Sequence, residues 1–146
     1  MIQNLWILNS DGICLFSRYV ENSEIRLVEG TKIDDQLFSG LFASIMMFAS
    51  EISNGKIEKV QISEGKYLFF THNNLIFIVR TNLNTSDKDV KKKIKIIQEL
   101  FVTKYKEKLE AFDGEVSSFL MFHEDLDDIF NKISKTEKWG KSLLDL

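Results

Sequence analysis

The stretch DDQLFSGLFASIMMFASEISN, residues 34–54, contains fifteen consecutive positions without a charged side chain, from Gln36 to Ser50. Its length and the spacing of its apolar residues predict one helix that ends before Gly55. At about 100° per residue, one broad arc of this helix holds its large apolar side chains: Leu37, Phe38, Leu41, Phe42, Ile45, Phe48, Ala49 and Ile52. The opposite arc is small and uncharged: Ser39, Gly40, Ala43, Ser44, Met47 and Ser50.

An ordinary surface helix carries lysine and glutamate on its outer side, and the small arc of this helix has neither. We therefore expect the large arc to pack on the protein's own sheet and the small arc to be covered by something else. Two explanations of what covers the small arc remain. It is either the chain's own segment 20–33, or a second subunit whose backbone can approach small residues closely. We favour the second subunit, most simply a symmetric dimer in which both copies use one patch. The residues predicted to bind this partner are Ser39, Gly40, Ala43, Ser44 and Met47 on the helix, and Val60 and Ile62 on a strand.

The rest of the chain predicts five strands and two more helices. The strands are expected at residues 2–8, 13–19, 56–63, 66–72 and 75–81, with a candidate short strand at 25–28, and the helices at about 86–109 and 116–134. The first and fifth strands are apolar on both faces, which is typical of the middle of a covered sheet, so the second and third belong at its edges. The predicted fold class is α+β: a five-stranded antiparallel sheet in the order ββ-α-βββ-α-α, with one helix on one face and two on the other.

This pattern resembles the longin domain, of the wider profilin-like group. The resemblance rests on the N-terminal hairpin with its Asp11-Gly12 turn, the FSGLFASIMMFASEI helix, and the KYLFF and LIFIVRT strands followed by a long helix. It spans residues 1–134 and leaves 135–146 as a C-terminal tail. The resemblance implies a non-enzymatic interaction module, because longin-like and roadblock-like domains serve as platforms in membrane-traffic machinery and hold small GTPases. The implied partners are a longin-type or roadblock-type subunit, in a homodimer or heterodimer, and a small GTPase.

Composition and charge restrict the expected cellular location of the protein and the classes of partner that it could bind. The net charge of −3 gives no general attraction to nucleic acid. Cys14 is the sole cysteine, so neither a disulfide framework nor a thiolate metal cluster is expected, and a reducing cytoplasm is the expected location. No signal peptide and no membrane span are expected. The lysine-rich range 88–95 fits the solvated face of an amphipathic helix better than a lipid-binding patch, so any membrane association is expected to be peripheral.

No catalytic, cofactor or metal motif is evident in the sequence. The best metal-like group is His123, Glu124, Asp125, Asp127 and Asp128. His123 and Asp127 share a helical face, but the spacing matches neither a hard-ion loop nor a zinc helix, and a solvated acidic face explains the group better. The seven glycines are scattered singly, so no glycine-rich phosphate loop exists. We therefore expect no enzymatic activity, no cofactor and no metal.

The alternative function is a small-molecule sensor of PAS-like or profilin-like architecture. Such a domain needs a cavity between helix and sheet, with a few polar groups that point inward. The positions predicted to point inward, such as Phe38, Phe42 and Phe77, are bulky and apolar. They favour a filled core, and hence the interaction module.

Overall fold

The computed structural model describes residues 2–19, 35–53, 57–62 and 65–132. Within these ranges the strands are β1 (Ile2–Leu8), β2 (Cys14–Tyr19), β3 (Lys59–Ile62), β4 (Gly65–His72) and β5 (Leu75–Asn82). The helices are α1 (Asp35–Ser53), α2 (Asp87–Glu110), the short 3₁₀ helix η1 (Val116–Phe119) and a last helix at 122–132. The candidate strand at 25–28 and the tail at 135–146 lie outside the described residues.

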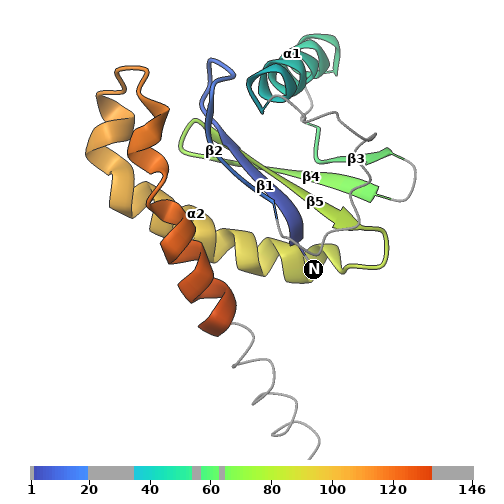
Figure 1. Cartoon of the computed structure of the whole chain (residues 1–146). Helices are drawn as coiled ribbons and strands as arrows, with labels where there is room; N and C mark the ends of the chain where they lie inside the picture. Colours follow the sequence, from blue (N-terminus) through green and yellow to red (C-terminus); the bar gives the residue numbers. More distant parts are fainter. Residues whose placement is uncertain (1, 20–34, 54–56, 63–64, 133–146) are drawn as a thin grey trace, which may run out of the picture.

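The five strands form one antiparallel sheet in the order β2-β1-β5-β4-β3. The strands that are apolar on both faces, β1 and β5, lie inside the sheet, and β2 and β3 form its edges. Helix α1 covers one face, whereas α2 and the last helix lie on the other (Figure 1). The predicted fold class, element order and layers are therefore confirmed.

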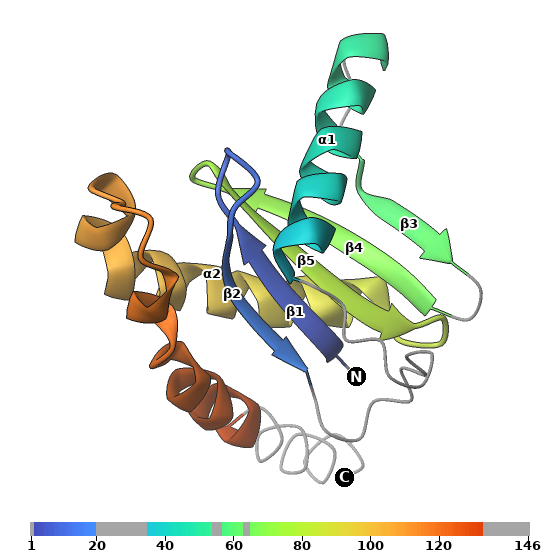
Figure 2. The same cartoon turned by 45° about the horizontal axis from the view of Figure 1, so that its top comes forward.

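Two tight hairpin turns lie at the same end of the sheet (Figure 2). In the β1–β2 turn Gly12 has a φ of 84°, and the Asn9 side chain accepts hydrogen bonds from the backbone N–H groups of Asp11 and Ile13. In the β4–β5 turn Asn73 and Asn74 both have positive φ angles, 47° and 63°. Two successive residues of this kind make the type I′ turn, whose twist matches that of the flanking strands.

The larger core lies between the sheet and α2. Helix α2 faces this core with five buried side chains at helical spacing: Val90, Ile94, Ile97, Phe101 and Tyr105. The rings of Phe119 and Phe122 pack on that of Phe101 with centroids 5.5 and 4.9 Å apart. These two rings bring the end of the described chain into the same core.

The predicted continuous helix at 116–134 is wrong at its start. The chain instead forms η1, two turn residues, and then the helix at 122–132. The Ser117 hydroxyl binds the Glu115 carboxylate, and the Leu120 N–H donates to the carbonyl of Ser117, three residues back. Such local bonds of serine compete with α-helical pairing, which explains the tighter first turn.

Lys66 of β4 anchors the start of α2 to the sheet. Its side chain is buried, and its ammonium group donates to the Asp87 carboxylate and to the carbonyl of Thr85. Lys59 of β3 donates to the other Asp87 oxygen at 2.9 Å. The hydrogen bonds from Lys66 and then Lys59 lower the pKa of Asp87. One carboxylate at the N-terminus of α2 therefore joins the helix to two strands.

We predict that Asp87→Asn destabilises the protein by about 1 kcal/mol at pH 7, because it removes the charged partner of a buried ammonium group while water screens the half-exposed site. The folded-state pKa of Asp87 lies below its unfolded value, so this stabilisation is full above the unfolded pKa and is lost as the pH falls through the folded pKa. Urea unfolding at pH 7 and in the acid range measures both effects. Asp89→Asn is the matched control, since Asp89 shares the first turn of α2 but binds neither lysine. Equal losses in the two variants would contradict the assignment.

Candidate functional site

Helix α1 packs on the sheet through a narrow aromatic contact. The ring of Phe38 stacks on Trp6 of β1, with centroids 4.2 Å apart and planes 22° from parallel. The ring of Phe42 lies 5.6 Å from Tyr67 and 5.4 Å from Phe69, both on β4. Phe38 and Phe42, one turn apart, are therefore the large side chains of α1 that are buried in the core, and Met46 packs beside them.

Polar contacts fix the rotation of α1 about its axis. The Asp35 carboxylate accepts hydrogen bonds from Trp6 Nε1 at 3.1 Å and from Ser17 Oγ at 2.6 Å. The Gln36 side chain accepts from the N–H of Cys14 and donates to its carbonyl, both at 3.0 Å. Gln36 thus binds the outer edge of β2 as a neighbouring strand would, and it holds the first turn of α1 against that edge.

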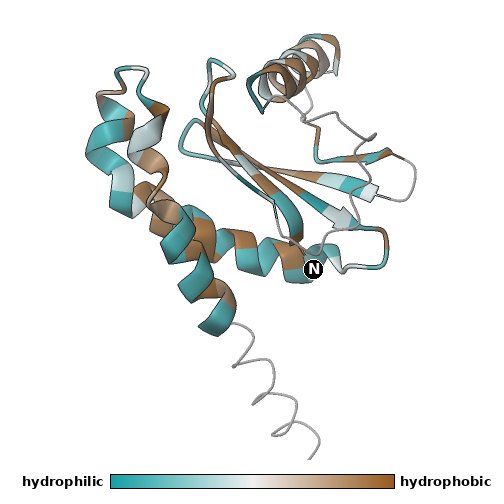
Figure 3. Ribbon diagram, in the orientation of Figure 1, coloured by the Kyte–Doolittle hydropathy of each residue, from teal (hydrophilic) through white to brown (hydrophobic). Residues whose placement is uncertain are grey.

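This rotation leaves most of the large apolar arc in solvent. Leu37, Leu41, Phe48 and Ile52 are 58–76% exposed, and Ile45 is 38% exposed. The prediction that the large arc packs on the sheet is therefore right for Phe38 and Phe42 and wrong for these five. We call Leu41, Ile45, Phe48 and Ile52 the α1 stripe. Figure 3 shows α1 as hydrophobic over much of its surface, unlike α2.

The small arc lies partly against the protein's own hairpin. Ser39 is buried and Ala43 is half-buried. A Cβ atom placed on Gly12 would lie 3.1 Å from the Cβ of Ala43, so small residues on both sides allow the β1–β2 turn to approach α1. The hairpin side of the domain therefore covers Ser39 and part of Ala43, and the expectation that a partner covers the small arc stays a prediction.

The other predicted helix residues remain on the surface. Gly40, Ser44 and Met47 are exposed, and they line a groove of about 850 Å³ between α1 and the two hairpin turns. The Ser44 hydroxyl donates to the carbonyl of Gly40 within the helix. These three residues stay candidates for partner contact, at the border of the α1 stripe.

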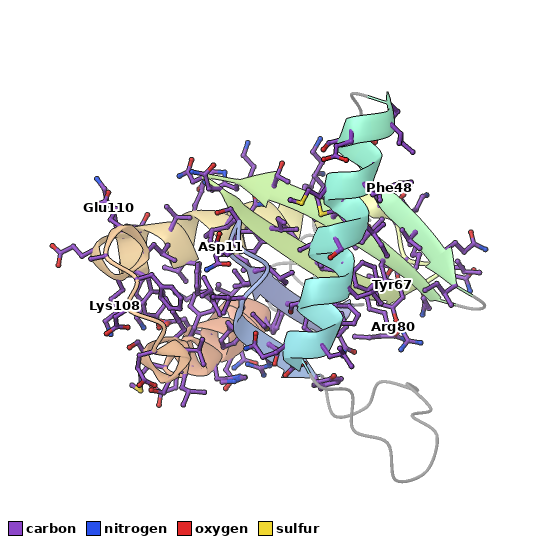
Figure 4. The ribbon with its side chains drawn as sticks, turned by 90° about the horizontal axis from the view of Figure 1, so that it is seen from above. Asp11, Phe48, Tyr67, Arg80, Lys108 and Glu110 are labelled. Atoms are coloured by element: carbon purple, nitrogen blue, oxygen red, sulfur yellow. The ribbon has the colours of Figure 1, made fainter. Side chains whose placement is uncertain are left out.

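The predicted strand residues lie on the same side of the sheet as α1. Val60 is half-buried and Ile62 is 52% exposed. In the described part of the chain, β3 pairs only with β4, which leaves its outer backbone edge without a neighbouring strand. Phe48 and Tyr67 lie on the same side of α1 (Figure 4). An exposed helix stripe and an unpaired strand edge therefore border one surface.

Sequence periodicity alone did not find the α1 stripe. A helix without charges from Gln36 to Ser50 offers no polar face to mark its outside. The sequence signal for the rotation of α1 was the aromatic pair Phe38 and Phe42, which could pack on Trp6, the tryptophan of the first strand. By length and composition alone α1 is apolar enough to cross a membrane, and the expectation of no membrane span stays a prediction. Its contacts with Trp6 and Cys14 make it a layer of this domain.

The acidic C-terminal group is used in ion pairs. Asp127 binds Arg18 of β2, and Asp125 binds Lys104 of α2. Arg18 also donates to the carbonyl of His123 at 2.9 Å. Burial and the nearby guanidinium of Arg18 lower the pKa of His123. Among the described residues, no group of three or more His, Cys, Asp or Glu side chains is placed to hold a metal ion.

Cys14 is the only thiol of the chain, and it is buried. Burial raises its pKa to about 11, and the thiol donates a hydrogen bond to the carbonyl of Phe16. Because the thiolate is the reactive form, this environment makes the side chain inert rather than nucleophilic.

We predict that Cys14 resists a thiol reagent in the folded protein at pH 8 and reacts fully after unfolding in guanidinium chloride. An aromatic disulfide reagent that releases a coloured thiolate, followed by absorbance, measures both rates. A free cysteine peptide at the same pH is the reference. Reaction of the folded protein at a rate within about tenfold of the peptide would contradict the buried, protonated thiol.

Comparison with known proteins supports the fold. No protein-family model matches the chain, and no curated protein sequence matches it significantly. Among solved structures, MglB from Myxococcus xanthus is similar with a TM-score of 0.54 at 12% identity, over 73% of this chain and 85% of that chain. The gliding protein MglB from Thermus thermophilus gives 0.53 at 8%, over 67% and 73%. An MglB with a tetrameric arrangement gives 0.54 at 11%, over 73% and 79%. The longin-like fold inferred from the sequence is thus confirmed.

Proposed function

We propose that this longin-like domain is a non-enzymatic interaction module of the cytoplasm, which self-associates through the α1 stripe and the outer edge of β3. In the assembly it works with a small GTPase, in a complex of the trafficking type. The single observation that carries the proposal is the exposure of the α1 stripe, four large apolar residues in one row on a helix without charges over fifteen positions.

Burial of the stripe is the source of affinity. Complete burial of a leucine, isoleucine or phenylalanine side chain stabilises by about 1.5–3 kcal/mol relative to full exposure. Exposed apolar patches on monomers are normally small, and a larger continuous one marks an interaction surface. The absence of charge from Gln36 to Ser50 also means that a partner can cover this part of α1 without desolvating an unpaired ion.

The outer edge of β3 fixes how a second copy is oriented in the proposed dimer. Unpaired N–H and C=O groups of an edge strand can add a strand from another chain. Val60 and Ile62 lie on the α1 side of β3, so a second copy paired at this edge would also bring its own α1 to the same side of the enlarged sheet. A two-fold arrangement uses one patch on both copies, which is the commonest geometry of homodimers. A paralogous longin-like subunit would fit the same surface.

The GTPase part of the proposal rests on the fold. The resemblance to longin-like domains implies a small GTPase among the partners, and one structurally similar MglB has a tetrameric arrangement. Within the described residues two of the acidic groups near His123, Asp127 and Asp125, are engaged with Arg18 and Lys104. That engagement favours a docking role over metal-dependent catalysis.

We predict that Leu41→Glu and Phe48→Glu each weaken self-association by at least about a hundredfold, because a buried carboxylate would face an apolar partner. Sedimentation velocity at protein concentrations from the low to the high micromolar range measures the monomer–dimer equilibrium of the wild type and of each variant. The control is Ile96→Glu, which places the same charge on an exposed apolar residue of α2. A wild-type protein that is monomeric throughout, or one whose dimer tolerates both α1 variants, would overturn the proposed interface.

We predict that the wild-type protein, used as bait in extract of its own cells, retains a polypeptide that carries guanine nucleotide, because the longin-like fold is proposed to hold a GTPase. Chromatography of the nucleotides released from the eluate measures GDP and GTP. Retention of proteins without any guanine nucleotide would contradict the GTPase part while leaving the self-association test unaffected.

A further inference from the structure

A row of four polar or amphipathic side chains crosses the sheet on the side of α1. Asn4 of β1 pairs in register with Tyr19 of β2 and with Arg80 of β5, and Arg80 pairs with Tyr67 of β4. Directly paired residues of neighbouring antiparallel strands have Cβ atoms about 4.5–5.5 Å apart on one face. We call Tyr19, Asn4, Arg80 and Tyr67 the polar row.

Three members of the row have buried polar atoms that lack a hydrogen-bond partner. Asn4 is 1% exposed, and neither its amide nitrogen nor its amide oxygen is bonded within the described part of the chain. The Tyr19 hydroxyl and Arg80 Nε are in the same condition. Buried groups of this kind are costly, and in native proteins they are nearly always satisfied. The expectation that the positions facing α1 are uniformly apolar is therefore wrong at Asn4 and Arg80.

Arg80 is held in place by its surroundings. Its guanidinium lies 5.7 Å from the centre of the Tyr67 ring, and a Cβ atom on Gly65 would lie 3.1 Å from Arg80 Nε. The absence of a side chain at Gly65 thus makes room for the guanidinium. Figure 4 shows Arg80 and Tyr67 together beside α1, where the half-buried arginine can be reached from solvent.

No carboxylate forms an ion pair with this guanidinium within the described part of the chain. The carboxylates of Asp87, Asp125 and Asp127 are taken by other cations: Lys59, Lys66, Lys104 and Arg18. Asp35, at the start of α1, is engaged by Trp6 and Ser17, and its charge is, after burial, the next cause of the raised pKa of Tyr19. A buried water would satisfy the Asn4 amide, whereas the half-buried guanidinium of Arg80 offers a charge and N–H donors to an anion that reaches the row from solvent.

We propose that the polar row binds the oxyanion group of a small molecule, a carboxylate or a phosphate, at its Arg80 end. The guanidinium supplies charge and N–H donors, which match the oxygens of either group. The Asn4 amide donates to the same group through Nδ2 and accepts from a hydroxyl or amino group of the ligand through Oδ1. The site is separate from the α1 stripe, because it rests on the strands and not on the exposed side of the helix.

The test is thermal unfolding of the full chain in increasing sodium phosphate or sodium succinate, each against sodium chloride of equal ionic strength. A bound anion stabilises only the folded state, so the midpoint is expected to rise by about 2–4 °C at ten or more times the dissociation constant. A response to phosphate, to succinate, or to both identifies the oxyanion. If neither anion raises the midpoint above that in chloride, the proposal is overturned.

Three variants tie the response to the row. Arg80→Gln removes the charge and is expected to abolish the shift, whereas Lys91→Gln removes an exposed charge on α2 and is expected to preserve it. Asn4→Leu is expected to raise the midpoint without ligand, since it deletes two unsatisfied groups, and to reduce the shift. A full shift in Arg80→Gln would overturn the site. Gain of stability and loss of response in Asn4→Leu together separate a binding residue from a structural one.

Discussion

The contact between α1 and the first strand determines what this protein presents to its surroundings. Phe38 stacks on Trp6, and the Trp6 indole donates to the Asp35 carboxylate. The aromatic stacking provides burial, while the hydrogen bond provides direction, because only one rotation of the helix satisfies both. That rotation turns Leu41 and Phe48 outward. The exposed apolar stripe is thus the consequence of an internal contact, and the surface chemistry follows from the core.

The sequence predicts the parts of this fold that depend on local pattern. Alternating apolar residues and the Asp11-Gly12 and Asn73-Asn74 turns define the strands. Strands β1 and β5 are apolar on both faces, which predicts their position inside the sheet. The rotation of α1 could not be predicted from local pattern, because the hydrogen bonds that fix it join residues 18 to 29 positions apart. The polar row was missed for a related reason. A register shift between Ile2 and Asn4 decides which face of β1 the asparagine occupies, and no local pattern reveals it.

The two edges of the sheet are treated differently. At β2, the Gln36 amide occupies the backbone groups of Cys14, and η1 packs nearby. At β3, a short strand ends in the exposed Ile62, with no neighbouring strand in the described part of the chain. Within the described residues, one edge is therefore covered at Cys14 by the chain's own side chain, and the other pairs with no further strand. Such asymmetry limits growth to one direction, which favours a closed pair over an extended fibre.

The close approach of Gly12 and Ala43 sets the distance between the β1–β2 turn and the middle of α1. Beyond Ala43 the helix continues to Ser53, a lever arm of roughly 15 Å at 1.5 Å per residue, and its last turns project past the sheet (Figure 2). A methyl group added at Gly12 would push Ala43 away by a few tenths of an ångström and tilt the helix. The displacement would be larger at the C-terminal end of α1 than at Ala43. Substitutions at Gly12 or Ala43 would therefore change the position of the α1 stripe relative to the sheet, while every residue of the stripe stayed the same.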